Sequence, residues 1–520
     1  MRRAGCITRD GSPPEAAASL ARARIPVSIL RVNAASDRAG DGPHRATRLS
    51  RFSSAIFLTA YFLYFNLGSL KVHFALDDVG NIDHYHNISP WQLVLSQFLP
   101  WRGDSRPMGG LFYIPIYHFA GLNPVPYQAV LLALLLANVY WVYRFAKLLG
   151  CCEAAALLAA LAVCYHVGLA NLYYNAAFVF DVLCCFFYLA SFVYYLRIRN
   201  RNRLLGPGQT VIFLALFLCA LNSKEMAVTI PLVVLAYEWF YHRPAALTSE
   251  HLRAWVRGPA RVALIAAVLD LLDVYGKISG PGAMTKAETY HPVFTLSRIY
   301  GFQSIAFRDL FSAGIWTPDW LGVLTIWVAL ALVAWVRSDL PVLRFLFWFL
   351  VVVPIPLEFL LGKAQACLCM LMVGWAIFVA VSLVDVTQTI GRAMVRYAHF
   401  NHLARRILEA ALVAAIAFYW ARENRHLQEG IVRNSMASQG FETWDLIEQL
   451  PNFQRPRPGS RVAFLSDPLP GTDMWHLAQL WVHDLRTDVH VGGEGPLTAQ
   501  QLAETDYIYT FEGRKMIQLK

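Results

Sequence analysis

Charged residues are scarce in this sequence. Asp, Glu, Lys and Arg make up 15% of its 520 residues, whereas hydrophobic residues make up 57%. A soluble domain normally carries about a quarter charged residues. Because the apolar residues also occur in long blocks, the pattern excludes one large soluble core and predicts a chain that crosses a lipid bilayer several times.

Three other features are missing. The first fifty residues contain no apolar core, which excludes an ordinary secretory signal peptide, and their many arginines predict a disordered, basic cytoplasmic leader over residues 1–51. None of the nine cysteines lies in the last hundred residues, so no disulfide framework is expected there. The net charge of +10 does not indicate nucleic acid binding, because the basic residues lie in short segments between apolar blocks.

Eleven apolar segments are candidate membrane spans. They lie near residues 52–70, 126–149, 153–171, 178–196, 209–222, 226–241, 260–275, 319–336, 343–361, 366–386 and 407–421. The connecting segments alternate between basic ones and ones that carry acids. Because positively charged loops stay in the cytoplasm, this alternation predicts a cytoplasmic N-terminus, an outer position for the long loop 71–125 and, with an odd number of spans, an outer C-terminal tail.

The long outer loop contains two semi-apolar pieces. Residues 89–101 carry Trp91 and Trp101 near their ends and are typical of a helix that lies in the headgroup plane. Residues 108–120 are broken by Pro115 and too short to span, so we expect a second interfacial helix. A true span at this place is the alternative, and it would shift the topology by one.

The tail, residues 422–520, has a different composition. It predicts a buried strand at 461–465, a helix at 472–485 and a hairpin formed by 507–511 and 516–519. The expected fold class is therefore an all-α polytopic membrane protein, with about eleven transmembrane helices in residues 52–421 and a small α/β extracytoplasmic domain in residues 422–520.

Several acids lie at the predicted outer ends of spans. Asp77 and Asp78 follow the first span, where two neighbouring carboxylates can hold one group as a base; on these residues alone a hydrated pair of loop acids is slightly favoured. Asp181, at the start of the fourth span, fits a polar cavity and a helix N-terminal acid equally well. A metal site made of Asp77, Asp78, His84 and His86 is an alternative, but loop histidines are usually solvated, so no metal is expected.

Three basic residues on the same side are candidates for phosphate binding. Lys224 lies in a tight turn and is followed by Glu225, which can hold the lysine or cap the next helix; an interfacial ion pair of little energy is the alternative. Arg106 closes the first outer loop, and Lys363 lies at the outer end of the ninth span.

Four pieces of the sequence together resemble the GT-C superfamily of polyprenyl-phosphate-sugar-dependent glycosyltransferases, especially its protein O-mannosyltransferase-like (GT39-like) branch. They lie at residues 74–78, 106–127, 166–181 and 223–238, within a resemblance that covers about residues 52–390. The last piece, with Ser223-Lys224-Glu225, is the most specific.

The resemblance implies a GT-C fold and an inverting transfer of a sugar from a polyprenyl-phosphate donor to an acceptor hydroxyl on the extracytoplasmic side of a bacterial inner membrane. Asp77 would be the general base and Asp78 would help to position the acceptor. The lipid bilayer and the lipid-linked sugar are the implied partners, without nucleic acid, and the acceptor stays open. The resemblance implies no cofactor, because the closest-looking branch works without a metal, and the use of a divalent metal stays open.

The remaining roles implied by the resemblance concern the leaving phosphate and the cavity. Arg106, Lys224 and Lys363 would neutralise the phosphate as it gains charge. Asp181 and Glu225 would organise the cavity. The enzyme interpretation therefore predicts that these groups and Asp77 converge.

The sequence departs from the family pattern at three places. Relatives often have an acid where Asn171 stands, a basic residue where Phe180 stands, and Arg and Tyr near Gln365 to Cys367. Two other interpretations stay open: a transporter or flippase for lipid-linked substrates, and a catalytically inactive GT-C-like scaffold. A transporter would favour inverted repeats and broken helices, which the sequence does not clearly display.

Overall fold

The computed structural model describes part of the chain. It covers residues 43–520 except 75–76, 103–105, 281–282, 287–289, 312–315, 338, 361–364, 399–401, 432–439, 470–472, 483–487 and 493–496. The chain divides into two units, Met1–Ile56 and Phe57–Lys520. Most of the predicted leader lies outside the described residues, and helix α1 (Pro43–Asn66) begins within its last part.

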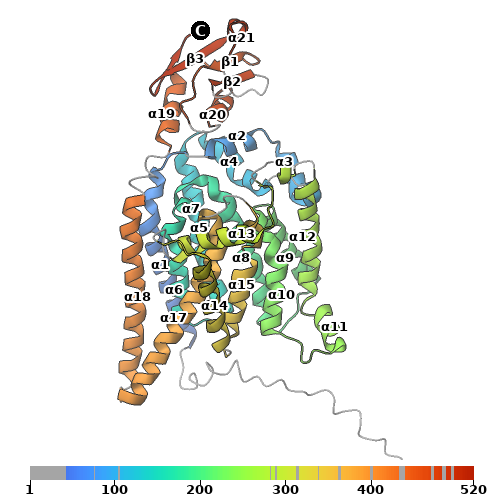
Figure 1. The fold of residues 1–520 in the computed structure, drawn as a ribbon, viewed down its shortest axis with the longest axis vertical. Helices are drawn as coiled ribbons and strands as arrows, with labels where there is room; N and C mark the ends of the chain where they lie inside the picture. Colours follow the sequence, from blue (N-terminus) through green and yellow to red (C-terminus); the bar gives the residue numbers. More distant parts are fainter. Residues whose placement is uncertain are drawn as a thin grey trace, which may run out of the picture. The chain divides into compact units, whose positions relative to one another are not determined.

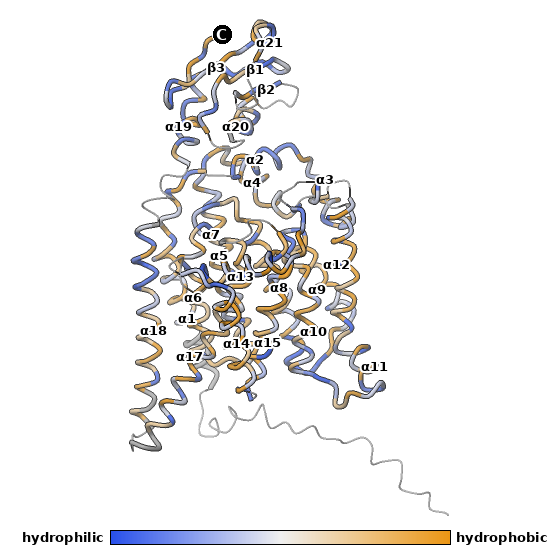
Figure 2. The backbone as a smooth tube through the Cα atoms, viewed as in Figure 1, coloured by the Kyte–Doolittle hydropathy of each residue, from blue (hydrophilic) through white to orange (hydrophobic). Residues whose placement is uncertain are grey.

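A helix lies at each of the eleven predicted spans in the described part of the chain. Besides α1, these helices are α5 (Pro124–Leu148), α6 (Glu153–Cys164), α8 (Val179–Arg199), α9 (Pro207–Leu221), α10 (Ile230–Tyr241), α12 (Arg261–Ser279), α14 (Trp320–Val336), α15 (Pro341–Val352), α17 (Cys369–Ala398) and α18 (His402–Ile431). Figure 1 shows α5, α8, α9, α10 and α15 running alongside one another, and Figure 2 shows that hydrophobic residues dominate them.

Five segments among the described residues are long and apolar enough to cross a membrane. They are Phe52–Lys71, Pro124–Leu148, Ala176–Arg199, Pro341–Glu358 and Ala366–Met394. The chain is thus an integral membrane protein of mainly helical structure, whereas the count of eleven spans stays a prediction. The remaining predicted spans are helices that are too short or too polar to meet the same criteria.

Two parts of the helical region differ from the prediction. Helix α6 ends at Cys164 and is followed by three short helices, η4 (Val167–Leu169), α7 (Asn171–Tyr174) and η5 (Ala176–Phe178), in place of one span to residue 171. The side chains of His166 and Asn175 accept hydrogen bonds that begin η4 and η5. Helix α13 (Leu296–Phe311) lies in a segment that was expected to be an outer loop. The helix was not predicted because charged residues interrupt the apolar pattern of its buried face.

Three helices lie at the end of the bundle that carries the C-terminal sheet. They are α2 (Asp78–His86), α3 (Pro90–Phe98) and α4 (Gly110–Ala120), seen at one end of the bundle in Figure 1. Ser89 and Gln92 form a capping box that begins α3, while Trp91 and Phe98 are exposed. The two predicted helices of the outer loop are confirmed, and their place in the headgroup layer stays a prediction.

The C-terminal residues form a four-stranded sheet with the order β2-β1-β3-β4. The strands are β1 (Arg461–Phe464), β2 (Asp488–Val491), β3 (Tyr507–Glu512) and β4 (Lys515–Gln518), and the helices beside them are α19 (Phe441–Gln449), α20 (Asp473–Val482) and α21 (Ala499–Glu504). Strand β1 pairs in parallel with β2 and β3, and β3 pairs antiparallel with β4. The predicted strand, helix and hairpin are confirmed, and β2 was not predicted.

The other described helices are short. They are η1 (Leu67–Lys71), η2 (Pro100–Arg102), η3 (Pro107–Gly109), η6 (Glu225–Thr229), α11 (Ser249–Arg257), η7 (Met284–Lys286), α16 (Ile355–Glu358), η9 (Gln365–Leu368) and η11 (Leu450–Asn452). Two of these helices mark the candidate site: η3 begins directly after Arg106, and η6 begins directly after Lys224.

A buried ion pair joins α8 to α10 at the end away from the sheet. Arg199 donates two hydrogen bonds to Glu238, at 2.6 and 2.8 Å, and Tyr195 donates a third at 2.7 Å. The Glu238 side chain has no exposed surface. Since an unpaired charge at such a place is very unfavourable, the pair fixes how these two helices pack.

We expect Glu238→Ala to destabilise the protein by about 3 kcal/mol or more, because the substitution leaves the buried Arg199 without its partner. The midpoint of thermal unfolding in detergent measures the change. Glu250→Ala removes an exposed glutamate of α11 and is the control. Equal midpoints for both variants would show that the pair contributes little.

Candidate functional site

Four of the predicted site residues form two ion pairs where η3, η6 and α8 begin. They are Arg106, Asp181, Lys224 and Glu225. Lys224 lies 2.5 Å from the Asp181 carboxylate. Arg106 donates hydrogen bonds to both carboxylate oxygens of Glu225, at 3.1 and 3.2 Å. Because Lys224 and Glu225 are adjacent, the turn between α9 and α10 joins the two pairs into one cluster, which we call the ion-pair cluster.

The backbone holds Arg106 in an unusual conformation. Its φ of 44° and ψ of 57° are left-handed, which costs a non-glycine residue about 1–2 kcal/mol. The Tyr85 hydroxyl donates to the Arg106 carbonyl at 2.8 Å, and the Met108 amide donates to the Asn222 carbonyl at 3.2 Å. Such strain persists only where surrounding contacts fix it, and here those contacts tie the outer loop to the turn that carries Lys224.

The Arg106 guanidinium is enclosed by aromatic rings. It lies 5.3 Å from the centre of the Phe180 ring and 5.7 Å from that of Tyr290, and it donates a hydrogen bond to the Tyr290 hydroxyl at 3.0 Å. Burial alone would lower the pKa of Arg106, but the charges of Glu225 and Tyr290 raise it above its ordinary value. Nitrogen Nη1 has no hydrogen-bond partner among the described residues, so it can donate to an anion.

Glu225 is held in its ionised form. Burial alone would raise its pKa, but the nearby charges of Arg106 and Lys277 outweigh burial and lower the pKa to about 2. Lys277, in the last turn of α12, donates to the Leu221 carbonyl at 3.0 Å and pairs with Asp273 at 3.1 Å. Lys277 was not predicted as a site residue; its spacing of four from Asp273 was the available signal.

The Lys224–Asp181 pair has unused hydrogen-bonding capacity. The ammonium group donates to Asp181 and to the Cys367 sulfur at 3.4 Å, which leaves its third hydrogen without a partner in the described structure. The carboxylate oxygen Oδ1 of Asp181 is buried and has no partner there either. Burial alone would lower the pKa of Lys224, but Asp181 raises it above its ordinary value. Since buried polar atoms are normally satisfied, the pair is suited to a polar ligand.

The acid pair lies at the N-terminal end of α2. Asp78 is buried, and its charge, after burial itself, raises the pKa of Tyr113. Tyr113 stacks on Tyr85 with ring centres 5.5 Å apart, and Tyr85 in turn holds the backbone of Arg106. Asp77 is exposed, and no described ion pair or side-chain hydrogen bond connects it to the ion-pair cluster. The structure thus connects Asp78 to the cluster through two tyrosines and leaves Asp77 exposed.

Gly109 allows this packing. A Cβ at this position would lie 2.4 Å from the Phe180 ring and 2.6 Å from the Tyr85 hydroxyl. Only glycine lets the chain after Arg106 approach both rings so closely.

Two of the sequence departures touch the cluster. Phe180 faces Arg106, and Cys367 contacts Lys224. Lys363 and the side chain of Gln365 lie outside the described residues. Among the residues that the structure does describe, no group of three or more His, Cys, Asp and Glu side chains is placed to hold a metal, so the alternative site with His84 and His86 is not assembled.

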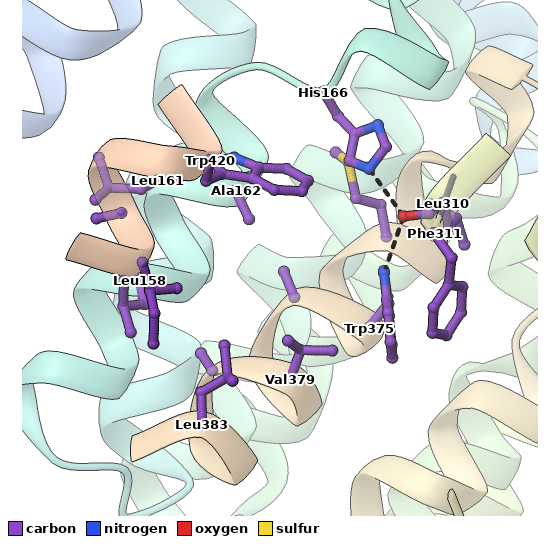
Figure 3. A pocket seen from close by; sticks show the side chains of 15 residues that line it. Leu158, Leu161, Ala162, His166, Leu310, Phe311, Trp375, Val379, Leu383 and Trp420 are labelled. Atoms are coloured by element: carbon purple, nitrogen blue, oxygen red, sulfur yellow. Dashed lines mark hydrogen bonds between the residues drawn. The ribbon is translucent and has the colours of Figure 1, made fainter. Parts of the chain in front are cut away.

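An apolar pocket of about 160 Å³ lies between α6, α13, α17 and α18. Its lining includes Leu158, Leu161, His166, Trp375, Leu383 and Trp420. Figure 3 shows His166 and Trp375 pointing toward the Leu310 carbonyl, at 3.1 and 3.3 Å. The Nδ1 atom of His166 accepts a further hydrogen bond from the Gly168 amide, so the polar groups of both side chains are satisfied, and most of the remaining lining residues offer apolar surface.

Comparisons with known proteins identify the fold. No family model matches the sequence, and no curated protein matches it significantly. The oligosaccharyltransferase AglB from Archaeoglobus fulgidus, solved with an inhibitory peptide and a dolichol-phosphate, has a TM-score of 0.50 and 12% identity, covering 89% of this chain and 69% of AglB. The chain has the GT-C fold.

A second solved structure is also similar. ArnT from Cupriavidus metallidurans, solved with undecaprenyl phosphate, has a TM-score of 0.48 and 13% identity, covering 82% of this chain and 84% of ArnT. The AglB structure confirms the GT-C fold implied by the four sequence pieces, and the comparisons do not single out the O-mannosyltransferase-like branch.

The Arg106–Glu225 pair predicts a pH dependence of stability. A carboxylate whose pKa falls from 4.5 to about 2 on folding stabilises the protein above pH 4.5, and this contribution is lost as the pH falls toward 2. In Arg106→Met the folded pKa of Glu225 rises, so we expect a smaller loss of stability between pH 5 and pH 3 than in the wild type. Thermal unfolding in detergent measures this difference.

Arg514→Met is the control for this comparison, because Arg514 is exposed and pairs only with Glu442 and Asp445 of α19 among the described residues. If Arg106→Met and the wild type lose the same stability over this pH interval, Arg106 is not what keeps Glu225 ionised.

Proposed function

We propose that the protein is a membrane glycosyltransferase that moves a sugar from a polyprenyl-phosphate donor to an acceptor hydroxyl. One observation carries this proposal: two cations, each held by a carboxylate, lie together beside an acid-bearing helix in a GT-C fold. The alternation of basic and acidic connecting segments supports an extracytoplasmic site. Dolichol-phosphate in the AglB structure supports a lipid-phosphate donor.

The cluster supplies what a departing lipid phosphate requires. The phosphate gains negative charge as the bond to the sugar breaks. Hydrogen-bond donors that are already in position stabilise this charge and lower the activation barrier, because they do not have to reorganise during the reaction. Arg106 offers Nη1, and Lys224 offers its third ammonium hydrogen. Glu225 and Asp181 keep both cations in place before the donor arrives, and Lys363 remains a third candidate for the same phosphate.

The apolar pocket is suited to part of the donor's isoprenoid chain. Cys367 contacts Lys224, and Met372, a few residues further along, lines the pocket. Because η9 leads directly into α17, one short stretch of chain connects the proposed phosphate position with apolar surface. A bound lipid could therefore place its phosphate beside Lys224 and part of its isoprenoid chain in the apolar pocket.

The acceptor side of the reaction is assigned to the acid pair. Asp77 is exposed and would take the proton of the attacking hydroxyl. The hydroxyl oxygen would attack the sugar carbon from the side opposite the leaving phosphate, so the configuration at that carbon would be inverted. Asp78 would position the acceptor, and the unpartnered oxygen of Asp181 would accept a hydrogen bond from a sugar hydroxyl.

Asp77→Asn should strongly reduce transfer and leave membrane insertion intact, because the amide cannot accept the proton. We expect a loss of about 100-fold or more. Mass spectrometry of cell-envelope glycans in a deletion strain, complemented with wild type or variant, measures it. Asp488→Asn in the C-terminal sheet is the control, and wild-type glycans in the Asp77→Asn strain would refute the assigned role.

Lys224→Met should weaken binding of undecaprenyl phosphate about tenfold or more, because a charge-assisted hydrogen bond is lost. Native mass spectrometry of the protein in nanodiscs measures the bound fraction. Lys515→Met, on the edge strand β4, is the matched control. Unchanged binding in Lys224→Met would remove the cluster from the donor site and favour a scaffold or a transporter that binds its substrate elsewhere.

A further inference from the structure

Helix α2 presents two opposite faces to different parts of the chain. At about 100° per residue, Asp78 and Tyr85 lie on one face, whereas Gly80 and Asp83 lie about half a turn away. The first face contacts Tyr113 and, through the Tyr85 hydroxyl, the Arg106 carbonyl. The second face contacts α20. Helix α2, at whose start the acid pair lies, is therefore placed between the ion-pair cluster and the C-terminal sheet with its helices, which we call the sheet domain.

The contact with α20 is polar and close. His476 Nδ1 lies 2.9 Å from Asp83 Oδ2, and the other Asp83 oxygen accepts a hydrogen bond from Asn87 at 3.2 Å. A Cβ at Gly80 would lie 3.1 Å from the His476 ring. The imidazole thus lies against the backbone of α2, and the carboxylate of Asp83, which has a partner on each oxygen, fixes its orientation.

A second contact lies on the other side of the acid pair. The His73 ring stacks on Trp444 of α19, with ring centres 4.9 Å apart and 21° between the planes. Gly440 has a φ of +84°, and a Cβ there would lie 2.2 Å from the Phe74 carbonyl oxygen. The backbone of Phe74 therefore packs directly against Gly440, at the start of α19, where a side chain would not fit.

We propose that the sheet domain is a positioning element for the acid pair, with His476 and Trp444 as its positioning residues. This proposal rests on the proposed function, because it assigns a purpose to the placement of Asp77. Helix α19 of the sheet domain contacts the chain before the acid pair, and α20 contacts the chain after it. Neither residue contacts the ion-pair cluster among the described residues, so donor binding should not depend on them.

The consequence is a specific kinetic pattern. A displacement of the base by about 1 Å can lower the rate of a transfer reaction about 100-fold, even when the substituted residue lies far from the chemistry. His476→Ala should therefore lower kcat about tenfold or more and leave the affinity for undecaprenyl phosphate unchanged. His476→Asn should retain most of kcat, since its amide nitrogen can reach the position of Nδ1.

The test measures transfer, undecaprenyl phosphate binding and hydrogen exchange of residues 78–86 in the full-length protein in nanodiscs. We expect faster exchange of these amides in His476→Ala and Trp444→Ala, and wild-type exchange in His476→Asn. Arg461→Ala breaks an exposed ion pair with Glu504 inside the sheet domain and is the control, with unchanged exchange and transfer. Asp83→Ala combined with His476→Ala should be no worse than either single variant.

The outcomes separate this inference from the proposed function. If the wild type transfers no sugar, the proposed function fails, and hydrogen exchange still decides whether the sheet domain holds α2. Unchanged exchange of residues 78–86 in His476→Ala would overturn the inference. A wild-type kcat in His476→Ala, in an active protein, would overturn it as well.

Discussion

A buried cation in a membrane protein needs a carboxylate beside it, and this requirement organises the end of the bundle that faces the sheet. Lys224 and Glu225 come from one turn, whereas Arg106 and Asp181 come from two other segments of the chain. Either charge left alone would be far more costly than the pair. The start of α8, the turn after α9 and the end of the outer loop must therefore meet in one arrangement, and the left-handed backbone of Arg106 is the local strain that this arrangement imposes.

The parts around the cluster follow from that constraint. The aromatic rings of Tyr85, Tyr113 and Phe180 pack against one another beside the cations. Helix α2 carries acids at its start and places its other face against the sheet domain. Helix α2 thus links the ion-pair cluster with the sheet domain, and this link is the basis of the positioning role that we propose for that domain.

The sequence predicted the helices well because apolar blocks and basic connectors are strong local signals. It also predicted that Arg106, Asp181 and Lys224 would converge. Convergence of Asp77 itself is not seen among the described contacts, because its carboxylate faces outward while Asp78 faces inward. The short helices after Cys164 could not be predicted, since they depend on side-chain caps from His166 and Asn175 rather than on hydropathy.

Long-range contacts were the least predictable part. His476 and Asp83 are 393 residues apart, and nothing local to either residue indicates the other. Helix α13 and strand β2 were missed because mixed charge and short length weaken their patterns. Lys277 was missed because a lysine near the end of an apolar helix usually has no role beyond the membrane interface.

The most direct test of the account is a cryo-EM structure of the protein in nanodiscs with undecaprenyl phosphate bound. We predict that the phosphate lies within about 3 Å of both Arg106 Nη1 and the Lys224 ammonium nitrogen, the distance of a charge-assisted hydrogen bond. A phosphate bound at the opposite end of α9 and α10, or away from both cations, would contradict it.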